Sequence, residues 1–371
     1  MSLPHIPLFK VFTSPEAHGA LKAVLDSGQL ACGPKTREFE SLVAGSLGQP
    51  NVVAISDASA ALTLALCMSG VRPGDEVITS PLACSASLMP IANLFASPVW
   101  CDIDPRSGMV DLAMIDRLIT DKTRALLVYL WSGDTVEFDL LAALARKHGI
   151  KLVIDASEAF GAAWHGRPIG DNADFTVFSF YATKHISCGE GACLVARTGE
   201  DAARARLLRR FGIDYAALRK ANGDLDPEFD IPVAGYNFQT NEVMATIGVE
   251  GMRYADTILS RYRENGLFYE TALAGIAGVQ RIERCKDSFS GYWTYSLLAE
   301  RRDELVRKLT ASGIGAQRLH LRNDTYKCFG GMRNKLPGID AFDAMNISIP
   351  CGWWVGPDER ERIVDTLRSG W

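Results

Sequence analysis

The chain has 371 residues, of which 47% are hydrophobic and 22% are charged, and its formal net charge is −5. This composition excludes a disordered chain, and the length allows either two closely associated domains or one large α/β unit. The sequence has no basic block and no basic residues interleaved with aromatic ones. We therefore expect no nucleic-acid partner.

The nine cysteines form no CxxC pair and no zinc-type pairing with histidine. We expect reduced thiols and no metal site. The chain does not open with a charged segment followed by an apolar one, and the apolar stretch from Ala58 to Val71 is too short to span a bilayer. We expect a cytoplasmic protein without a membrane partner.

In chain order, the region from about 51 to 196 alternates short apolar runs with amphipathic runs of helical length, which is typical of a mostly parallel sheet wrapped by helices. One crossover is especially clear: strand 124–131, helix 137–149 and strand 150–155, with Gly149 as the helix stop. The predicted strands are NVVAIS, DEVITS, SPVWCDI, RALLVYLW, KLVIDAS and DFTVFSFY.

The second half of the chain changes character. Residues 200–210 and 241–265 predict long helices, and they are followed by a strand at 292–300, a helix at 301–313 and a closing helix at 357–371. We interpret residues 1–250 as a large α/β domain and residues 251–371 as a smaller α+β domain.

Lys184 lies between two β-like segments and is followed by the turn Gly189-Glu190-Gly191. One interpretation is a solvated loop ammonium. The other is a partly desolvated nucleophile that loses its proton and condenses with an aldehyde.

Asp155 ends the strand KLVID, at the edge where open α/β sheets bind ligands. It could be a helix-capping or solvent-facing carboxylate. It could also hold the proton on the ring nitrogen of a pyridoxal cofactor, which needs that proton to accept electrons.

The stretch NVVAISDASAALTLAL turns from a strand into a helix near Ala58 and Ser59. The backbone N–H groups at such a helix start suit a phosphate, and the Ser59 hydroxyl could add to them. The alternative is that Asp57 is simply a helix cap.

Together these residues resemble the DegT/DnrJ/EryC1/StrS family of pyridoxal-phosphate-dependent sugar aminotransferases. VFSFYATKHISCGEGACLV resembles the segment in which the family lysine runs into a GEGG turn. Further matches lie in order along the chain: CGPKTREFE, VRPGDEVITSPLACSAS, VIDASEAFGAAWHGRPIG, AGYNFQTNEVMATIG, HLRNDTYKCF and IPCGWW.

The resemblance implies a fold-type I transferase: a large domain with a mostly parallel seven-stranded sheet, a smaller C-terminal domain, and a homodimer with shared active sites. It implies that Lys184 holds pyridoxal 5′-phosphate as an imine and then moves the proton, while Asp155 pairs with the ring nitrogen. The residues implied for the phosphate are Ala58, Ser59, Ser179 and, from the neighbouring subunit, Asn237. His320 and Arg322 match a segment that approaches the sugar nucleotide in relatives.

The chain departs from the family pattern at several cofactor positions. Glu158 stands where the family has histidine or glutamine near the phenolic oxygen of the cofactor, so its carboxylate would repel a phenolate unless it is protonated or turned away. Cys84 replaces the aromatic ring that commonly stacks on the cofactor, and Ala58 replaces a glycine. Lys184 and Asp155 remain as the family has them.

The implied activity is transfer of an amino group from glutamate to a keto-sugar nucleotide, for a surface polysaccharide or a secondary metabolite. Relatives that dehydrate sugars carry histidine at the lysine position, and here that position is Lys184, with His185 next to it. Two alternatives stay open: an aminotransferase for a keto-cyclitol or another non-nucleotide ketone, and a cofactor-binding regulator without turnover.

Overall fold

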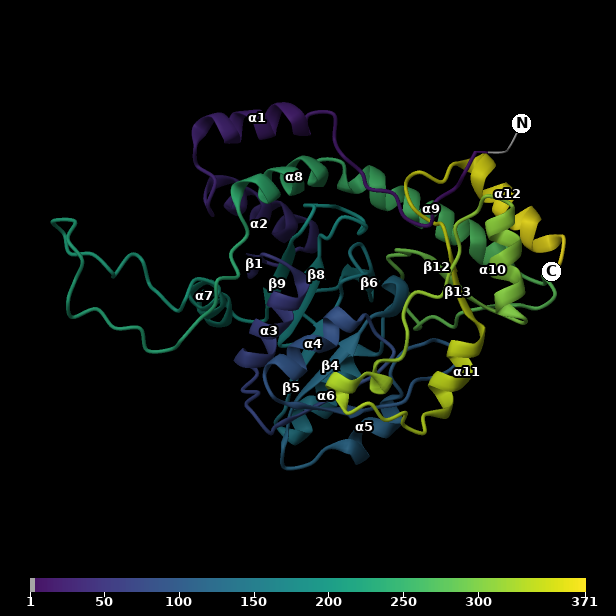
Figure 1. Cartoon of the computed structure of the whole chain (residues 1–371), viewed down its shortest axis with the longest axis horizontal. Helices are drawn as coiled ribbons and strands as arrows, with labels where there is room; N and C mark the ends of the chain where they lie inside the picture. The colour runs from purple at the N-terminus through teal and green to yellow at the C-terminus, as the bar shows by residue number, and fades with distance from the viewer. Residues whose placement is uncertain (1–3) are drawn as a thin grey trace.

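The computed structural model describes residues 4–371, and its centre is a seven-stranded sheet (Figure 1). The strand order is β1-β9-β8-β5-β4-β2-β3. The strands are β1 (Val52–Ile55), β2 (Glu76–Thr79), β3 (Ser97–Trp100), β4 (Thr123–Tyr129), β5 (Lys151–Asp155), β8 (Phe175–Ser179) and β9 (Ala192–Ala196).

The five strands from β8 to β3 run parallel, and β9 pairs antiparallel with both β1 and β8. The predicted α/β fold with a mostly parallel seven-stranded sheet is therefore confirmed. In the register of the sheet, Tyr129 pairs with Asp155, and Asp155 with Val177. The carboxyl ends of β4, β5 and β8 consequently meet at one edge.

Helices cover both faces of this sheet. Alternate strand residues enter two different hydrophobic clusters; Ile154, for example, belongs to one and Val153 to the other. The first cluster includes side chains from α2 (Pro34–Leu47), α5 (Leu112–Leu118), α6 (Phe138–His148) and α8 (Glu242–Met252). The second includes side chains from α3 (Ala58–Met68), α4 (Ser85–Asn93) and α7 (Gly199–Leu208).

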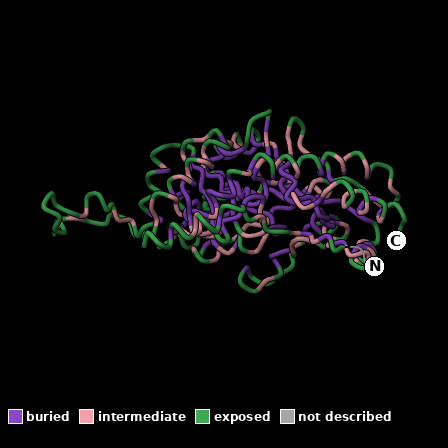
Figure 2. The backbone as a smooth tube through the Cα atoms, turned by 90° about the horizontal axis from the view of Figure 1, so that it is seen from above, coloured by how far each residue is buried: buried purple, intermediate pink, exposed green. Residues whose placement is uncertain are grey.

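A second unit lies at the end of the molecule where both chain termini are found (Figures 1 and 2). Its antiparallel sheet has the order β10-β12-β13 and a core of its own, to which Ile6 also contributes. The elements are β10 (Val279–Arg281), β12 (Tyr295–Ala299), β13 (Asn346–Ile349), α10 (Arg302–Ala311) and α12 (Pro357–Arg368).

Helix α9 (Ala255–Ala272) joins the two units: Ile258 and Tyr262 pack in the core of the large sheet, whereas Tyr269 packs in the second core. The division at residues 250 and 251 stays a prediction. The segment 241–265, predicted as helical, is two helices, because α8 ends at Met252 and α9 begins at Ala255. Helix α6 ends as predicted at Gly149, which has a left-handed φ of 65°.

Shorter elements complete the chain. A small sheet of β11 (Ser288–Phe289), β6 (Ala163–Trp164) and β7 (Arg167–Pro168) connects residues from the two halves of the sequence. The remaining elements are α1 (Ala17–Ser27), α11 (Pro337–Met345) and the 3-10 turns η1 (Trp131–Gly133), η2 (Asn323–Thr325) and η3 (Lys327–Phe329). None of the helices within residues 4–371 has the length and apolar character needed to cross a bilayer.

Residues 212–235, which we call the arm, project from the body between α7 and α8 in both views (Figures 1 and 2). The two ends of the arm are held together at its base, where Phe211 N–H donates to the Tyr236 carbonyl at 2.8 Å. A Cβ added at Gly235 would lie 2.3 Å from the Gly212 nitrogen, so this close approach requires glycine.

Candidate active site

A cavity of about 660 Å³ opens at the carboxyl edge of the large sheet, beside the starts of α3 and α4. The strand ends Tyr129 and Ser179 line it. Both side chains lie on the sheet face that α3 and α4 cover. Tyr129 belongs to the hydrophobic cluster on that face, and Ser179 is two positions from Val177, which also belongs to it. The volume is in the usual range for ligand pockets.

Lys184 projects into this cavity from the turn after β8. Phe180 N–H donates to the Gly191 carbonyl at 2.8 Å and Ala182 N–H to the Gly189 carbonyl at 2.9 Å, so the glycine turn folds the chain back and fixes the lysine loop. Lys184 Nζ lies 3.6 Å from the centroid of the Trp293 ring, and its side chain is only 12% exposed. The structure therefore agrees with the desolvated interpretation of Lys184 rather than the solvated loop.

Asp155 lies at the end of β5, fully buried behind Ser87 and Ser157, which line the cavity. Its Oδ1 accepts the Ser157 N–H at 3.0 Å, but among the described residues Oδ2 has no hydrogen-bond partner. Burial raises the pKa of this carboxyl. An orphaned carboxylate oxygen at the sheet edge fits a protonated ring nitrogen, which would supply both the missing donor and the missing positive charge.

The start of α3 forms another wall. Asp57 caps the helix by accepting the Ala60 N–H at 2.8 Å, and its other oxygen accepts the Ser56 hydroxyl at 2.9 Å. The predicted capping role of Asp57 is thus confirmed. The first N–H groups of a helix have no partner within it, which leaves those of Ala58 and Ser59 for an anion beside Ser179.

Glu158 is a fully buried carboxylate that contacts the lysine. Its Oε1 lies 3.5 Å from Lys184 Nζ and 3.2 Å from His320 Nε2, and its Oε2 accepts the Ser132 N–H at 2.9 Å. Burial alone would raise the pKa of Glu158, but the Lys184 ammonium and then His320 outweigh it and lower the pKa to about 2. The lowered pKa argues against protonation as the way around repulsion of a phenolate, because the Glu158 carboxylate is paired with the Lys184 ammonium.

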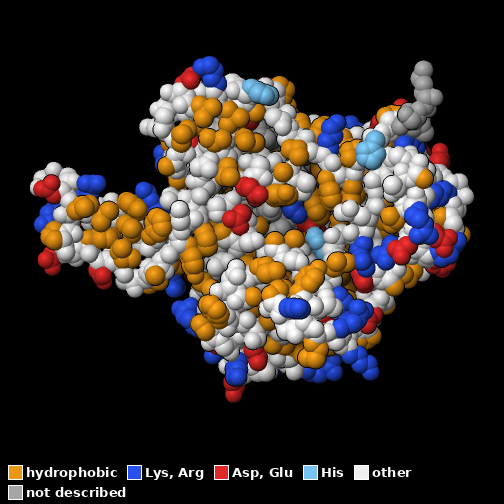
Figure 3. Space-filling model, viewed as in Figure 1, with side chains coloured by type: hydrophobic (Ala, Val, Ile, Leu, Met, Phe, Trp, Pro, Cys, Tyr) orange, Lys and Arg blue, Asp and Glu red, His pale blue; other side chains and the backbone are white. Residues whose placement is uncertain are grey.

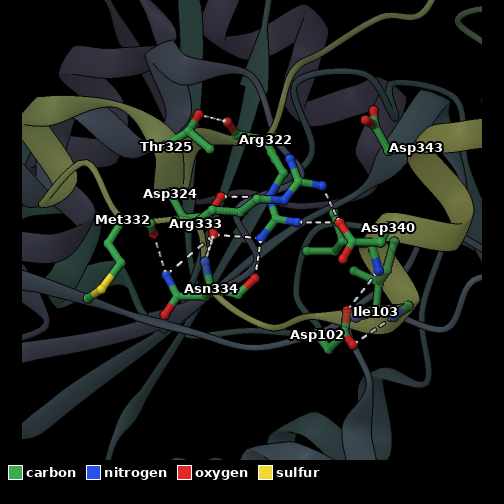
Figure 4. A network of polar contacts seen from close by, with 12 residues as sticks. Asp102, Ile103, Arg322, Asp324, Thr325, Met332, Arg333, Asn334, Asp340 and Asp343 are labelled. Carbon is green, nitrogen blue, oxygen red and sulfur yellow. Dashed lines mark hydrogen bonds and ion pairs between the residues drawn. The ribbon is translucent and has the colours of Figure 1, made fainter.

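His320 and Arg322 come from the segment between β12 and α11, and the structure separates them. His320 lines the cavity, with Nε2 lying 3.0 Å from the Tyr129 hydroxyl. Arg322 is 4% exposed and does not line it. Instead its guanidinium makes two hydrogen bonds to Asp324, at 2.8 and 2.6 Å, and one to Asp340 at 2.6 Å (Figure 4).

Of two other residues predicted to bind the cofactor, Cys84 lines the cavity and Asn237 does not. Cys84 is the N-cap residue of α4 and lines the cavity, and burial raises the pKa of its thiol. Asn237 is exposed at the base of the arm and does not line the cavity of its own chain. Any contact of Asn237 with a cofactor therefore requires a second chain, as the resemblance implies.

Sequence reasoning missed three residues that shape the site. Trp293 covers the lysine and donates its indole N–H to the Thr183 carbonyl at 2.8 Å. The Ser132 N–H donates to the Glu158 carboxylate, and the Tyr129 hydroxyl forms a hydrogen bond with His320 Nε2. Only Tyr129 carried a usable signal, since it ends a strand next to the one that ends in Asp155.

Comparisons with known proteins agree with this geometry. The structure of the sugar aminotransferase CalS13 from Micromonospora echinospora matches with a TM-score of 0.93 and 35% identity, covering 99% of this chain and 100% of that one. The spore coat polysaccharide biosynthesis protein SpsC of Bacillus subtilis (strain 168) is 29% identical over 356 residues, which is 93% of this chain and 92% of SpsC.

A third relative is the UDP-4-amino-4-deoxy-L-arabinose–oxoglutarate aminotransferase of Shewanella sediminis (strain HAW-EB3). It is 27% identical over 383 residues, covering 99% of this chain and 98% of that protein. The model of the DegT/DnrJ/EryC1/StrS aminotransferase family matches residues 13–368. The chain therefore belongs to the DegT/DnrJ/EryC1/StrS aminotransferase family.

Proposed function

We propose that this aminotransferase moves an amino group from glutamate to a keto-sugar linked to a nucleotide. Pyridoxal 5′-phosphate is the cofactor of the family. The observation that carries the proposal is that Lys184 lines the cavity, while the unpartnered oxygen of Asp155 is buried behind two serines of the same lining. An amine that can condense and a carboxylate that lacks a cation are the two groups that pyridoxal chemistry needs from a protein.

When bound, the cofactor supplies an aldehyde for the lysine and a ring that accepts electrons. We assign its attachment to Lys184 and the proton on its ring nitrogen to Asp155. The N–H groups of Ala58 and Ser59 and the hydroxyl of Ser179 bind the phosphate. Once released, the Lys184 amine would be the base that takes a proton from the amino-acid carbon and returns it to the former aldehyde carbon, two bonds away across the nitrogen.

The volume and lining of the cavity support a substrate beyond the cofactor. The cavity of about 660 Å³ is lined by apolar, hydroxyl and charged side chains, among them Tyr129 and His320. The relatives named above act in sugar metabolism, and one of them bears a nucleotide sugar and oxoglutarate in its name. These features support a keto-sugar nucleotide as acceptor and glutamate as donor.

The test is a coupled assay for 2-oxoglutarate, with glutamate as donor and a panel of keto-sugar nucleotides and keto-cyclitols as acceptors. We expect turnover with at least one keto-sugar nucleotide and a lower kcat/KM with every keto-cyclitol. Turnover with cyclitols alone would establish the alternative acceptor class. Failure of glutamate to convert the bound cofactor to its amine form would refute the assignment of the donor.

We also propose a homodimer in which each arm reaches the partner chain. Among the described residues, the arm exposes Tyr215, Leu225, Ile231 and Val233, and Leu225 is 60% exposed. Hydrophobic side chains gather over much of the face of the arm that Figure 3 displays. An apolar projection of this kind supports a covering partner.

A complementation experiment tests the shared site. Lys184→Ala and Asn237→Ala chains are each expected to be impaired, and after mixing and subunit exchange the mixed dimers should have one intact site, about a quarter of all sites. Activity that never exceeds the mean of the two variants would contradict a contribution of Asn237 across the interface.

A further inference from the structure

The contact between Glu158 and Lys184 places a carboxylate 3.5 Å from the lysine nitrogen, the atom that we expect to react with the cofactor. Both carboxylate oxygens of Glu158 are engaged, Oε1 by Lys184 and His320 and Oε2 by the Ser132 N–H. Glu158 has no solvent exposure. The charge therefore stays near the lysine nitrogen.

The backbone that holds the Glu158 carboxylate through the Ser132 N–H is itself fixed by close contacts. Ser132 adopts a left-handed conformation with φ of 57°, which is strained for a residue with a side chain. Its hydroxyl is fixed by Thr294 Oγ1 at 2.7 Å and Ser296 Oγ at 2.9 Å. A Cβ on Gly133 would lie 2.6 Å from the Glu158 carbonyl oxygen, so the two segments are in close contact.

The ion pair with Glu158, at 3.5 Å, is the charge contact that the described residues give the Lys184 nitrogen. His320, 3.2 Å from the same carboxylate oxygen, is a second group able to carry a proton, and the buried Asp155 carboxyl also acts on Lys184. The other titratable side chains that face Glu158 or Lys184 are Tyr129, Cys84 and His185.

Condensation with an aldehyde changes how many protons the nitrogen of Lys184 holds. The ammonium forms a C=N bond, the aldehyde C=O bond breaks, and the oxygen leaves as water with two of the three nitrogen protons. One proton remains, and the nitrogen stays positive. If that last proton were lost to solvent, the Glu158 carboxylate would face a neutral nitrogen in place of a cation.

We propose that Glu158 keeps the last proton on the Lys184 nitrogen after the aldehyde of pyridoxal phosphate has bound there, so that the coloured adduct stays protonated to higher pH than in a protein without this carboxylate. The inference rests on the proposed attachment at Lys184. It concerns one of the residues at which this chain departs from the family pattern, and it gives Glu158 the role of holding a proton in position.

The experiment is a pH titration of the long-wavelength absorbance of the full-length holoenzyme. Glu158→Gln keeps the size of the side chain and an acceptor for Ser132 but removes the charge. We expect the titration midpoint of the wild type to lie at least about one pH unit above that of Glu158→Gln, since an opposite charge at this distance has effects of that size. Glu158→Asp, which withdraws the carboxylate, should lie between them.

Two control variants distinguish an effect of the Glu158 charge from an effect of a disturbed structure. Glu190→Gln removes an exposed carboxylate that lines the same cavity without a contact to Lys184, and its midpoint should equal that of the wild type. His320→Asn leaves the whole charge of Glu158 to the lysine nitrogen, so its midpoint should be equal to or above that of the wild type. A merely structural role would shift the midpoints of His320→Asn and Glu158→Gln in the same direction.

Equal midpoints for the wild type and Glu158→Gln overturn the inference and leave the proposed function intact. A wild-type protein that takes up no cofactor overturns both. If Glu158→Gln does not fold, Glu158→Asp and His320→Asn carry the test, and a His320→Asn midpoint below that of Glu158→Asp contradicts the inference.

Discussion

Two buried carboxylates three residues apart, Asp155 and Glu158, lie in opposite electrostatic situations. Asp155 has an oxygen without a partner, and burial raises the pKa of its carboxyl. Glu158 is equally buried, yet Lys184 and His320 lower its pKa to about 2. One carboxylate lacks a cation and the other already has one.

This difference indicates which group awaits a ligand. A native structure rarely leaves a buried carboxylate oxygen unpaired, so Asp155 points to a cationic partner that the chain itself does not supply. Glu158 needs no such partner and instead restrains the lysine. A cationic group is therefore what the Asp155 carboxylate lacks, whereas the Glu158 carboxylate already has the Lys184 ammonium beside it.

Removal of the amine is expected to have the largest effect. Lys184→Ala takes away both the nucleophile and the cation of Glu158, so turnover should fall by at least about 10³-fold. The visible band of the holoenzyme should vanish as well. The control is Lys151→Ala, at the opposite end of β5, which should retain both the turnover and the visible band. Wild-type-like turnover of Lys184→Ala would refute the assignment of Lys184 as the amine that binds the cofactor.

Asp155→Asn tests the other side of the comparison. The amide keeps the shape but cannot hold a proton on the ring nitrogen, so we expect cofactor binding with a rate lower by about 10²- to 10⁴-fold. Rapid-mixing measurement of the first half-reaction checks this, with Asp174→Asn as a control. An unchanged rate would remove Asp155 as the ring partner.

The stability of the cofactor-free protein should respond to the two carboxylates with opposite signs. Asp155→Asn removes an uncompensated buried charge and should raise the free energy of unfolding by on the order of 1 kcal/mol. Glu158→Gln breaks an ion pair and should lower it by about 3 kcal/mol. Urea unfolding of the apoprotein measures both, and changes of equal sign would remove the distinction.

His185 sharpens the comparison as a third buried group beside Lys184. Burial lowers its pKa from 6.5 to about 4. Between these values the unfolded chain binds a proton that the folded chain does not, so stability should fall by about 2 kcal/mol as the pH drops from 6.5 to 5. In His185→Gln the free energy of unfolding should depend less steeply on pH in this window. An unchanged slope would mean that other groups cause the pH dependence.

Much of the architecture could be predicted because its signals are local. Strands such as 151–155 are short apolar runs between amphipathic helices, and Gly149 marks a helix end through its own backbone preference. Asp155 and Lys184 stood out for a similar reason, since Asp155 ends a buried strand and Lys184 lies in the turn between two such strands. The predicted phosphate site also depended on one local feature, the start of α3.

The remaining parts of the site depend on contacts between distant residues. His320 lies 162 positions from Glu158, and Trp293 is 110 positions from the carbonyl to which it donates. A charge pattern in sequence does not reveal such partners. Arg322 illustrates this: its neighbour His320 faces the cavity, whereas its own guanidinium is neutralised by Asp324 and Asp340.

The most direct test of the account is to locate the covalent attachment of the cofactor. The purified full-length protein is incubated with pyridoxal phosphate, reduced with borohydride, digested and examined by mass spectrometry. We expect one pyridoxyl group per chain, on the peptide that contains Lys184. An adduct confined to another lysine, or none at all, would contradict it.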